Sequence, residues 1–202
     1  MKTTAIPNIL VIVVSIGALH LANMIHDELT IERAMGPVKH LSDARHLIVN
    51  KDFNGAIKEM DDAMMQMRVI ERYADSSSVA HIERAVQDLE IVEDEIRSDS
   101  LVVEDLNKAF FNALNSIAHV CMTLSENNLD QGERFKAMRF MNATFAEMIA
   151  SLKFVNTDEL RHKEEKVIGH VREIIDQMEA TNYTFRFDYD SINHELEELI
   201  DN

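Results

Sequence analysis

The chain has 202 residues, among them 5 glycines, 2 prolines and 1 cysteine, and its formal net charge is −16. An acidic surface repels phosphate backbones, so this composition argues against nucleic-acid binding. Cys121 is the single cysteine, which excludes an intrachain disulfide framework and a CxxC redox motif. No proline occurs after Pro37, and such a composition is typical of long helices joined by short polar turns.

Residues 1–37 are predicted to be a hydrophobic anchor or signal segment followed by a short stalk. Lys2 precedes the apolar residues 9–22, and residues 5–25 reach the length of about 20 residues that a bilayer-spanning helix needs. The sequence favours an uncleaved membrane anchor in residues 5–25. The shorter apolar run also suits a cleaved signal peptide, and a buried first helix of a cytoplasmic bundle is a third alternative.

The charges that flank this segment predict its orientation. Lys2 lies before the apolar run, and Asp27, Glu28 and Glu32 follow it. The positive-inside rule then keeps Lys2 on the cytoplasmic side and places residues 38–202 beyond the membrane, in the periplasm or outside the cell. Gly36 and Pro37 are predicted to stop the helix that begins in the apolar run.

Residues 38–181 are predicted to form an antiparallel bundle of about six helices. Apolar residues recur there at alternating spacings of three and four, as in helices that pack in bundles. The predicted helices cover about residues 38–50, 53–74, 79–97, 102–125, 133–154 and 158–180. Asp52 is predicted to be the N-cap of the second helix, and breaks are predicted at residues 75–78 and 126–132. Alternating strands and helices and a glycine-rich phosphate loop are both missing from the sequence, so the predicted fold class is all-α.

One stretch of this bundle, "ARHLIVNKDFNGAIKEMDDAM" at residues 44–64, resembles a tetratricopeptide helical hairpin. The residues that carry the resemblance are Ala44, Leu47, Ile48, Ala56, Met60 and Ala63, on either side of the turn "KDF". In that family, small residues let two helices pack closely, and tandem copies build a peptide-binding groove. No copy recurs 34 residues further on, so the resemblance implies the hairpin and not the groove.

Four methionines lie close together in residues 60–67. Met60, Met64 and Met67 keep helical three-four spacing with Ile57, which predicts a buried stripe, whereas Met65 points elsewhere. Methionine is a common filler of irregular cores. Because thioethers also bind soft ions, a copper site at Met60, Met64 and Met67 is the alternative.

A second candidate metal motif is the Glu-x-x-His pair formed by Glu159 and His162. A di-iron carboxylate bundle needs two such motifs and two further glutamates, and the sequence has no second copy. His81, His162 and His170 are therefore predicted to be surface residues. Haem held by methionine and histidine stays open as a variant of the metal-binding alternative. The sequence thus predicts no catalytic residue and no bound cofactor.

Residues 182–202 form a third region. Tyr183, Phe185, Phe187 and Tyr189 alternate with polar residues, which is the periodicity of an extended strand. The segment is interpreted either as a strap whose rings lie between helices or as a partner-binding strand made by these four residues. A short acidic helix is predicted to follow it.

These features predict a non-enzymatic interaction protein. The expected function is that of a membrane-anchored or exported helical protein, an accessory subunit or scaffold of an envelope complex. Its partners are expected to be proteins, and its membrane contact is expected at residues 5–25. The alternative is an envelope protein that binds copper or haem through methionine and histidine.

Overall fold

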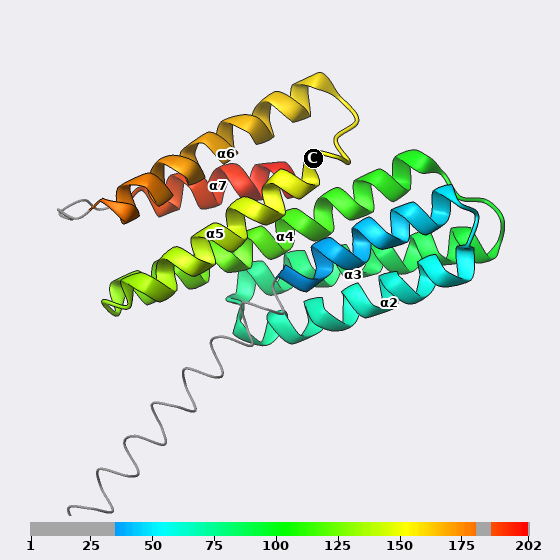
Figure 1. The fold of residues 1–202 in the computed structure, drawn as a ribbon, viewed down its shortest axis with the longest axis horizontal. Helices are drawn as coiled ribbons and strands as arrows, with labels where there is room; N and C mark the ends of the chain where they lie inside the picture. The colour runs from blue at the N-terminus through cyan, green and yellow to red at the C-terminus, as the bar shows by residue number, and fades with distance from the viewer. Residues whose placement is uncertain (1–34, 181–186, 202) are drawn as a thin grey trace, which may run out of the picture.

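The computed structural model describes residues 35–180 and 187–201, and each regular element in these two ranges is helical (Figure 1). The predicted all-α class is therefore confirmed. The predicted N-terminal hydrophobic helix lies outside the described residues. The first described helix covers residues 35–49, and the elements after it are α2 (Phe53–Ile70), a 3-10 turn (Glu71–Tyr73), α3 (Ser76–Arg97), α4 (Val103–Asp130), α5 (Arg134–Ser151), α6 (Asp158–Glu179) and α7 (Tyr189–Ile200).

Short polar side chains fix where several helices begin. Asp52 accepts a hydrogen bond from the backbone N–H of Gly55 at 3.0 Å, which confirms it as the N-cap of α2. Asp75 does the same for α3 through the N–H of Ser78 at 2.8 Å. The serines 76–78 were expected to break the chain, but they form the first turn of α3 because Asp75 caps them.

The end of α4 differs from the prediction for a related reason. The sequence predicts a loop from Glu126, yet α4 continues to Asp130. The Asn128 side chain donates to the carbonyl of Leu124 at 2.7 Å, so this residue is accommodated inside the helix. The stop comes at Gly132, whose φ of 79° lies in the left-handed region that ends helices.

The predicted stop at Gly36 and Pro37 is wrong, because both residues lie inside the helix of residues 35–49. A proline ring clashes mainly with the Cβ and N–H of the preceding residue, and glycine has no Cβ. The space beside Gly36 is taken by a neighbouring helix. A Cβ built on Gly36 would stand 1.5 Å from Oε1 of Gln66 on α2.

The bundle is organised around α4, which packs against α3, α5 and α7. α2 lies on α3, and α6 packs on both α5 and α7 (Figure 1). The first helix contacts α2 through His40 and Glu59. It also reaches the end of α5, where Arg45 donates to the carbonyl of Lys153 at 3.2 Å and lies over the ring of Phe154.

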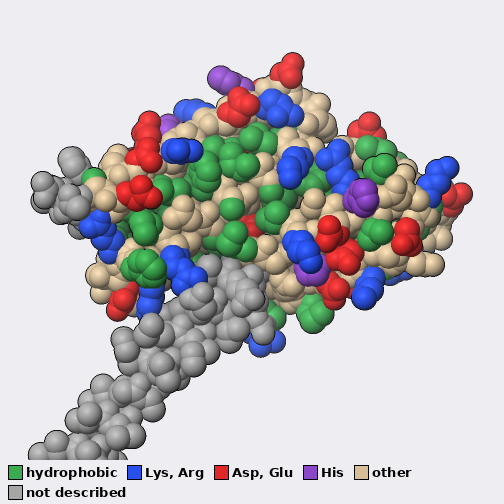
Figure 2. All heavy atoms as spheres, in the orientation of Figure 1, with side chains coloured by type: hydrophobic (Ala, Val, Ile, Leu, Met, Phe, Trp, Pro, Cys, Tyr) green, Lys and Arg blue, Asp and Glu red, His purple; other side chains and the backbone are tan. Residues whose placement is uncertain are grey.

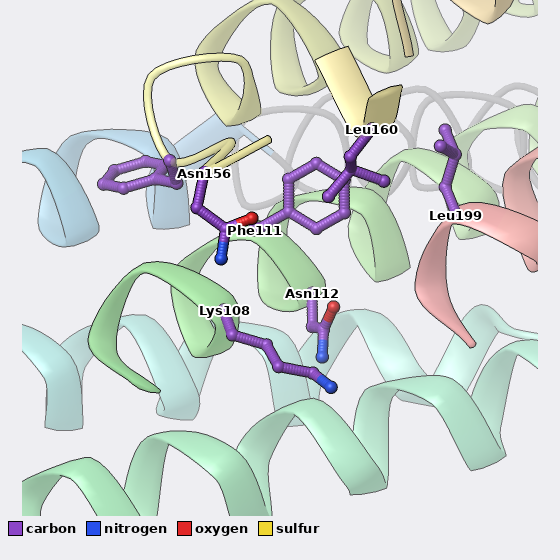
Figure 3. Close-up of a pocket in the computed structure, with 7 residues that line it drawn as sticks. Lys108, Phe111, Asn112, Asn156, Leu160 and Leu199 are labelled. Carbon is purple, nitrogen blue, oxygen red and sulfur yellow. The ribbon is translucent and has the colours of Figure 1, made fainter. Parts of the chain in front are cut away.

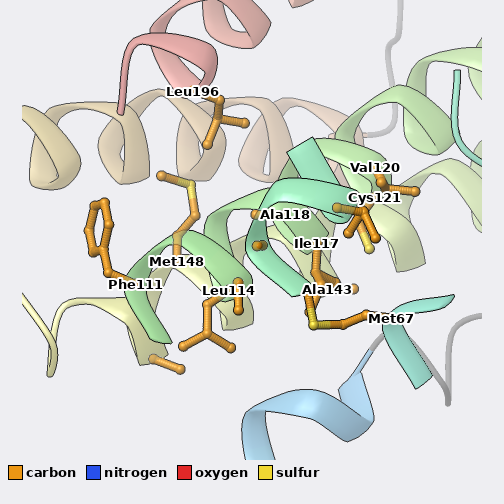
Figure 4. Close-up of a cluster of buried hydrophobic side chains, with 14 of the residues drawn as sticks. Met67, Phe111, Leu114, Ile117, Ala118, Val120, Cys121, Ala143, Met148 and Leu196 are labelled. Atoms are coloured by element: carbon orange, nitrogen blue, oxygen red, sulfur yellow. The ribbon is translucent and has the colours of Figure 1, made fainter. Parts of the chain in front are cut away.

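The burial of α4 agrees with this central position. Every residue from Ala109 to Met122 is buried, so the helix is covered on all sides. Figure 4 shows Ile117, Ala118 and Leu114 of α4 beside Met148 and Leu196, which come from α5 and α7. Within residues 35–180 and 187–201, none of the helices has the combination of length and apolar character that crossing a bilayer requires.

Candidate functional site

The methionines of α2 are placed as the core interpretation predicts. Met60 and Met67 are 0 % exposed and Met64 is 7 % exposed, whereas Met65 is 60 % exposed. Met67 lies beside Ile117 and Ala143, far into the apolar interior (Figure 4). Three of the four thioethers therefore fill the core between α2 and its neighbours.

Glu159 and His162 lie on the exposed face of α6. Glu159 pairs with Lys163, one turn along the same helix, at 3.3 Å. In the part of the chain that the structure describes, one group of three residues brings potential metal-ligand atoms within 4.8 Å of one another, and it consists of His40, Glu59 and Asp62. Neither Glu159 nor His162 belongs to that group.

A buried polar network that the sequence did not predict joins α4, α5 and α6. Glu164, Asn115 and Ser151 are all 0 % exposed. Oε1 of Glu164 accepts hydrogen bonds from Nδ2 of Asn115 at 3.3 Å and from the hydroxyl of Ser151. Desolvation by burial raises the pKa of Glu164 to about 7 and outweighs both hydrogen bonds, which lower it.

A second buried carboxyl lies on α5. Glu147 is 0 % exposed, and neither of its carboxylate oxygens has a hydrogen-bond partner among the residues described. Burial alone raises its pKa well above the usual 4.5, which favours the neutral form of the carboxyl. Cys121 of α4 is also fully buried, and this burial, with Glu147 nearby, raises the pKa of its thiol. The thiol is therefore unreactive.

Two histidines, His81 on α3 and His119 on α4, form a third buried group. The rings of His81 and His119 meet edge to face with centroids 5.4 Å apart, and the prediction that His81 is a surface residue is wrong, since it is 7 % exposed. Nδ1 of His119 lies 2.9 Å from the hydroxyl of Ser78, and its Nε2 lies 3.7 Å from Glu197 on α7. Desolvation, followed by His81, lowers the pKa of His119.

This serine, histidine and glutamate differ from a catalytic triad. In a triad, the serine faces Nε2 and the acid faces Nδ1, whereas the two nitrogens are exchanged here. Ser78 is also 0 % exposed, so a substrate has no path to its hydroxyl. The arrangement is better explained as a buried hydrogen-bonded contact that holds α3, α4 and α7 together.

A pocket of about 200 Å³ opens between α4, α6 and α7 (Figure 3). Its lining is part apolar and part polar: Lys108, Phe111, Asn112, Phe154, Asn156, Leu160 and Leu199. Asn112 donates to the carboxylate of Asp88 at 3.2 Å. Glu147, Glu164 and His119, three of the buried groups with shifted pKa values, do not line this pocket.

A more apolar groove of about 390 Å³ lies where α5 begins and α6 ends. Its lining residues are Arg134, Phe135, Met138, Met178 and Glu179. Arg134 donates to the carbonyl of Ala180 at 2.7 Å and to that of Met178, which closes the end of α6. Phe135 is 68 % exposed. Phe53, the other aromatic residue among the exposed large hydrophobic residues described, is 38 % exposed. Figure 2 shows further hydrophobic side chains gathered over the middle of the face that carries α5.

The predicted aromatic segment falls partly inside the described residues. Tyr183 and Phe185 lie outside them. Tyr189 is the first residue of α7 and is 5 % exposed, and its hydroxyl lies 3.2 Å from that of Ser125 on α4. The ring of Phe187 meets that of Tyr189 at 5.9 Å and packs on the core. The end of the segment therefore lies against the bundle, but Tyr189, which was predicted to be in an extended strand, belongs to α7.

The first helix and α2 follow each other in the chain and contact each other through His40, Glu59 and Gln66. Ala44, Ala56 and Ala63 are each 0 % exposed, so small residues do lie where the two helices meet their neighbours. Kinship with the tetratricopeptide family stays a prediction. No protein-family model matches the chain, and comparison with curated proteins and with solved structures found no similar protein.

Proposed function

We propose that the protein is a non-enzymatic interaction protein, an accessory subunit or scaffold whose docking surface is the groove between the start of α5 and the end of α6. The observation that carries this proposal is the exposure of Phe135. This residue is 68 % exposed and lines the same groove as Met138 and Met178. An aromatic ring and two methionines in one groove match the surfaces that bind amphipathic helices, since methionine adapts its shape to a partner.

The distribution of chemically active side chains supports a binding role. Glu147, Ser78 and Cys121 are each 0 % exposed. A group that acts on a substrate has to reach it, and the pocket between α4, α6 and α7 contains none of these three residues.

The expected occupant of the groove is a basic amphipathic helix of a partner protein. Its apolar face would cover Phe135, Met138 and Met178. A chain with a net charge of −16 attracts basic partners and repels acidic ones. Residues 5–25 would hold the protein in the membrane and present the bundle on the extracytoplasmic side, where such a complex would form.

A photo-crosslinking amino acid at position 135 of the full-length protein tests the groove. We expect irradiation of native membranes to join it to one partner and mass spectrometry to map the joined peptide to a basic amphipathic helix. The same amino acid at Val49, which is 74 % exposed on the first helix, is the control and should not join that partner. Equal crosslinking from both positions, or an acidic or non-helical peptide at position 135, would overturn the proposal.

The membrane part of the proposal has its own test. Mass spectrometry of the mature chain should find the N-terminus at residue 1 or 2 and the protein in the membrane fraction. An N-terminus near residues 18–24 would show that a signal peptide is removed, and the anchor proposal would then be wrong.

Metal binding has one specific observation in its favour as a second function. His40, Glu59 and Asp62 converge between the first helix and α2. They supply nitrogen and oxygen ligands, which suit borderline and hard divalent ions better than the copper(I) for which the methionines were considered.

A further inference from the structure

His40, Glu59 and Asp62 meet across the seam between two helices. His40 lies on the first helix, and Nδ1 of its ring is 2.7 Å from Oε2 of Glu59 on α2. Glu59 and Asp62 are three residues apart, so they share one face of α2. One ligand atom from each of the three residues lies within 4.8 Å of the others.

These three side chains are only partly exposed. His40 is 20 % exposed and Glu59 is 25 % exposed, measured on the side chains, and Asp62 is of intermediate exposure. Two carboxylates compensate the charge of a divalent cation, and an imidazole adds the nitrogen ligand that Zn²⁺ favours. Zinc bonds of about 2.0–2.2 Å place tetrahedral ligand atoms about 3.3 Å apart, which rotations of the two carboxylates can reach.

A fourth residue orients the imidazole. Nε2 of His40 lies 3.0 Å from the side-chain amide of Gln66, one turn beyond Asp62 on α2. Zinc-bound histidines commonly donate the N–H of their second ring nitrogen to a nearby oxygen. Turning the Gln66 amide by 180° presents its carbonyl oxygen to Nε2–H, and that leaves Nδ1 free to bind the ion.

The sequence makes room for this amide. A Cβ at position 36 would stand 1.5 Å from Oε1 of Gln66, so only a glycine there lets Gln66 keep its place beside His40. The cluster therefore has two anionic ligands, one nitrogen ligand, a side chain that orients the nitrogen ligand, and a glycine that accommodates that side chain.

We propose that His40, Glu59 and Asp62 bind one Zn²⁺ ion, completed by water, and that Gln66 positions His40 for it. The bound ion joins the first helix to α2 and so fixes the helix through which residues 1–34 connect to the bundle. In the bound state Nδ1 of His40 holds the ion, and Nε2 carries the ring N–H that the Gln66 amide oxygen accepts. This site is independent of the groove at Phe135.

Zinc titration of the full-length protein, purified without an affinity tag and treated with EDTA, tests the site. We expect one Zn²⁺ per chain and an increase of the thermal midpoint with zinc. His40→Gln and Asp62→Asn should each abolish both effects. Gln66→Ala should weaken zinc binding about 10- to 100-fold, the usual effect of losing a residue that orients a ligand.

Asp61→Asn is the matched control. Asp61 is the exposed neighbour of Asp62 and carries the same charge, so this variant should bind zinc within about twofold of wild type. Melting without metal shows that each variant is folded. The proposal is overturned if wild type fails to bind at about 100 µM zinc, if His40→Gln binds as wild type does, or if Asp61→Asn loses as much affinity as Asp62→Asn.

Discussion

Nδ2 of Asn115 on α4 lies 3.3 Å from Oε1 of Glu164 on α6, at a place where neither residue is exposed to solvent. The pKa of Glu164 is raised to about 7 there, chiefly by desolvation. Between the ordinary value of 4.5 and about 7, the folded protein then binds more protons at this carboxyl than the unfolded chain does. Its contribution to stability is present at low pH and is lost as the pH rises through about 7.

Glu164→Gln should therefore stabilise the protein at alkaline pH. Glutamine keeps the shape and can accept from Asn115, but it has no charge to desolvate. We expect a gain in the free energy of unfolding of about 3 kcal/mol at most at pH 8, which shrinks as the pH falls toward 5. Urea unfolding at both pH values measures it. A gain of equal size at both values would show that the charge is not the cause.

Glu147→Met should also stabilise the protein. Both carboxylate oxygens of Glu147 are buried without a described hydrogen-bond partner, and methionine fills a similar volume without polar atoms. The expected gain is about 1–3 kcal/mol in the free energy of unfolding at pH 7. The same change at Glu159, which is exposed, should stay within about 0.5 kcal/mol. A loss of stability at position 147 would contradict the assignment of this carboxyl as an unsatisfied group.

His119 should make the protein less stable in mild acid. Its lowered pKa means that the unfolded chain takes up the proton first as the pH falls below 6.5, so stability declines from that point. The groups that face it are Ser78 and His81 from α3, Glu197 from α7, and Asp75 at the start of α3. The loss of unfolding free energy between pH 7 and 5.5 should be smaller in His119→Gln than in wild type. An unchanged or steeper decline in the variant would refute this assignment.

The methionines of α2 should differ sharply in their contribution to stability. Met64→Ala opens a cavity in the core and should cost about 2–5 kcal/mol, whereas Met65→Ala, at a position 60 % exposed, should cost much less. Met64→Leu should cost less than about 1.5 kcal/mol because it nearly conserves volume. Chemical denaturation of the three variants gives the comparison. Equal losses at positions 64 and 65 would contradict the core placement.

Removing residues 182–202 should lower thermal stability, because it removes α7 and its buried apolar face. Leu196, which is 0 % exposed, gives a milder version of the same test. Leu196→Ala should cost about 2–5 kcal/mol, while His194→Ala, at an exposed position of α7, should cost less than about 0.5 kcal/mol. Unchanged melting of both the truncated chain and Leu196→Ala would mean that α7 does not contribute to the core.

The sequence predicted the parts of the fold that follow from periodicity and local capping. The apolar stripe of Met60, Met64 and Met67 and the N-cap at Asp52 depend on residues within one helix or one turn, and both were confirmed. The ends of α3 and α4 differed from the prediction, because serine and asparagine occur both at caps and inside helices. Whether Asn128 breaks α4 depends on its own bond to the carbonyl of Leu124, which the pattern does not show.

The polar interior could not be predicted in the same way. Glu147 is the one charged residue in residues 140–152, so its uncharged surroundings were a signal of burial. Glu164 lies among charged residues of α6, and only the angle at which α4, α5 and α6 cross decides that it faces inward. His81 was placed on the surface for the same reason. A signal was available for His119, because it lies inside the continuous apolar stretch of α4. His40 meets Glu59 and Asp62 only because the first helix packs against α2. A spacing within one helix cannot predict such a contact.

The central position of α4 has a consequence for folding. Its 28 residues span about 42 Å, and it packs against helices that precede it and helices that follow it in the chain. Neither group can complete the burial of its apolar faces until α4 has been synthesised and docked, so residues 35–97 alone do not form a complete core. A ribosome would have to release most of the chain before the domain becomes resistant to proteases, and unfolding should then occur in a single cooperative step.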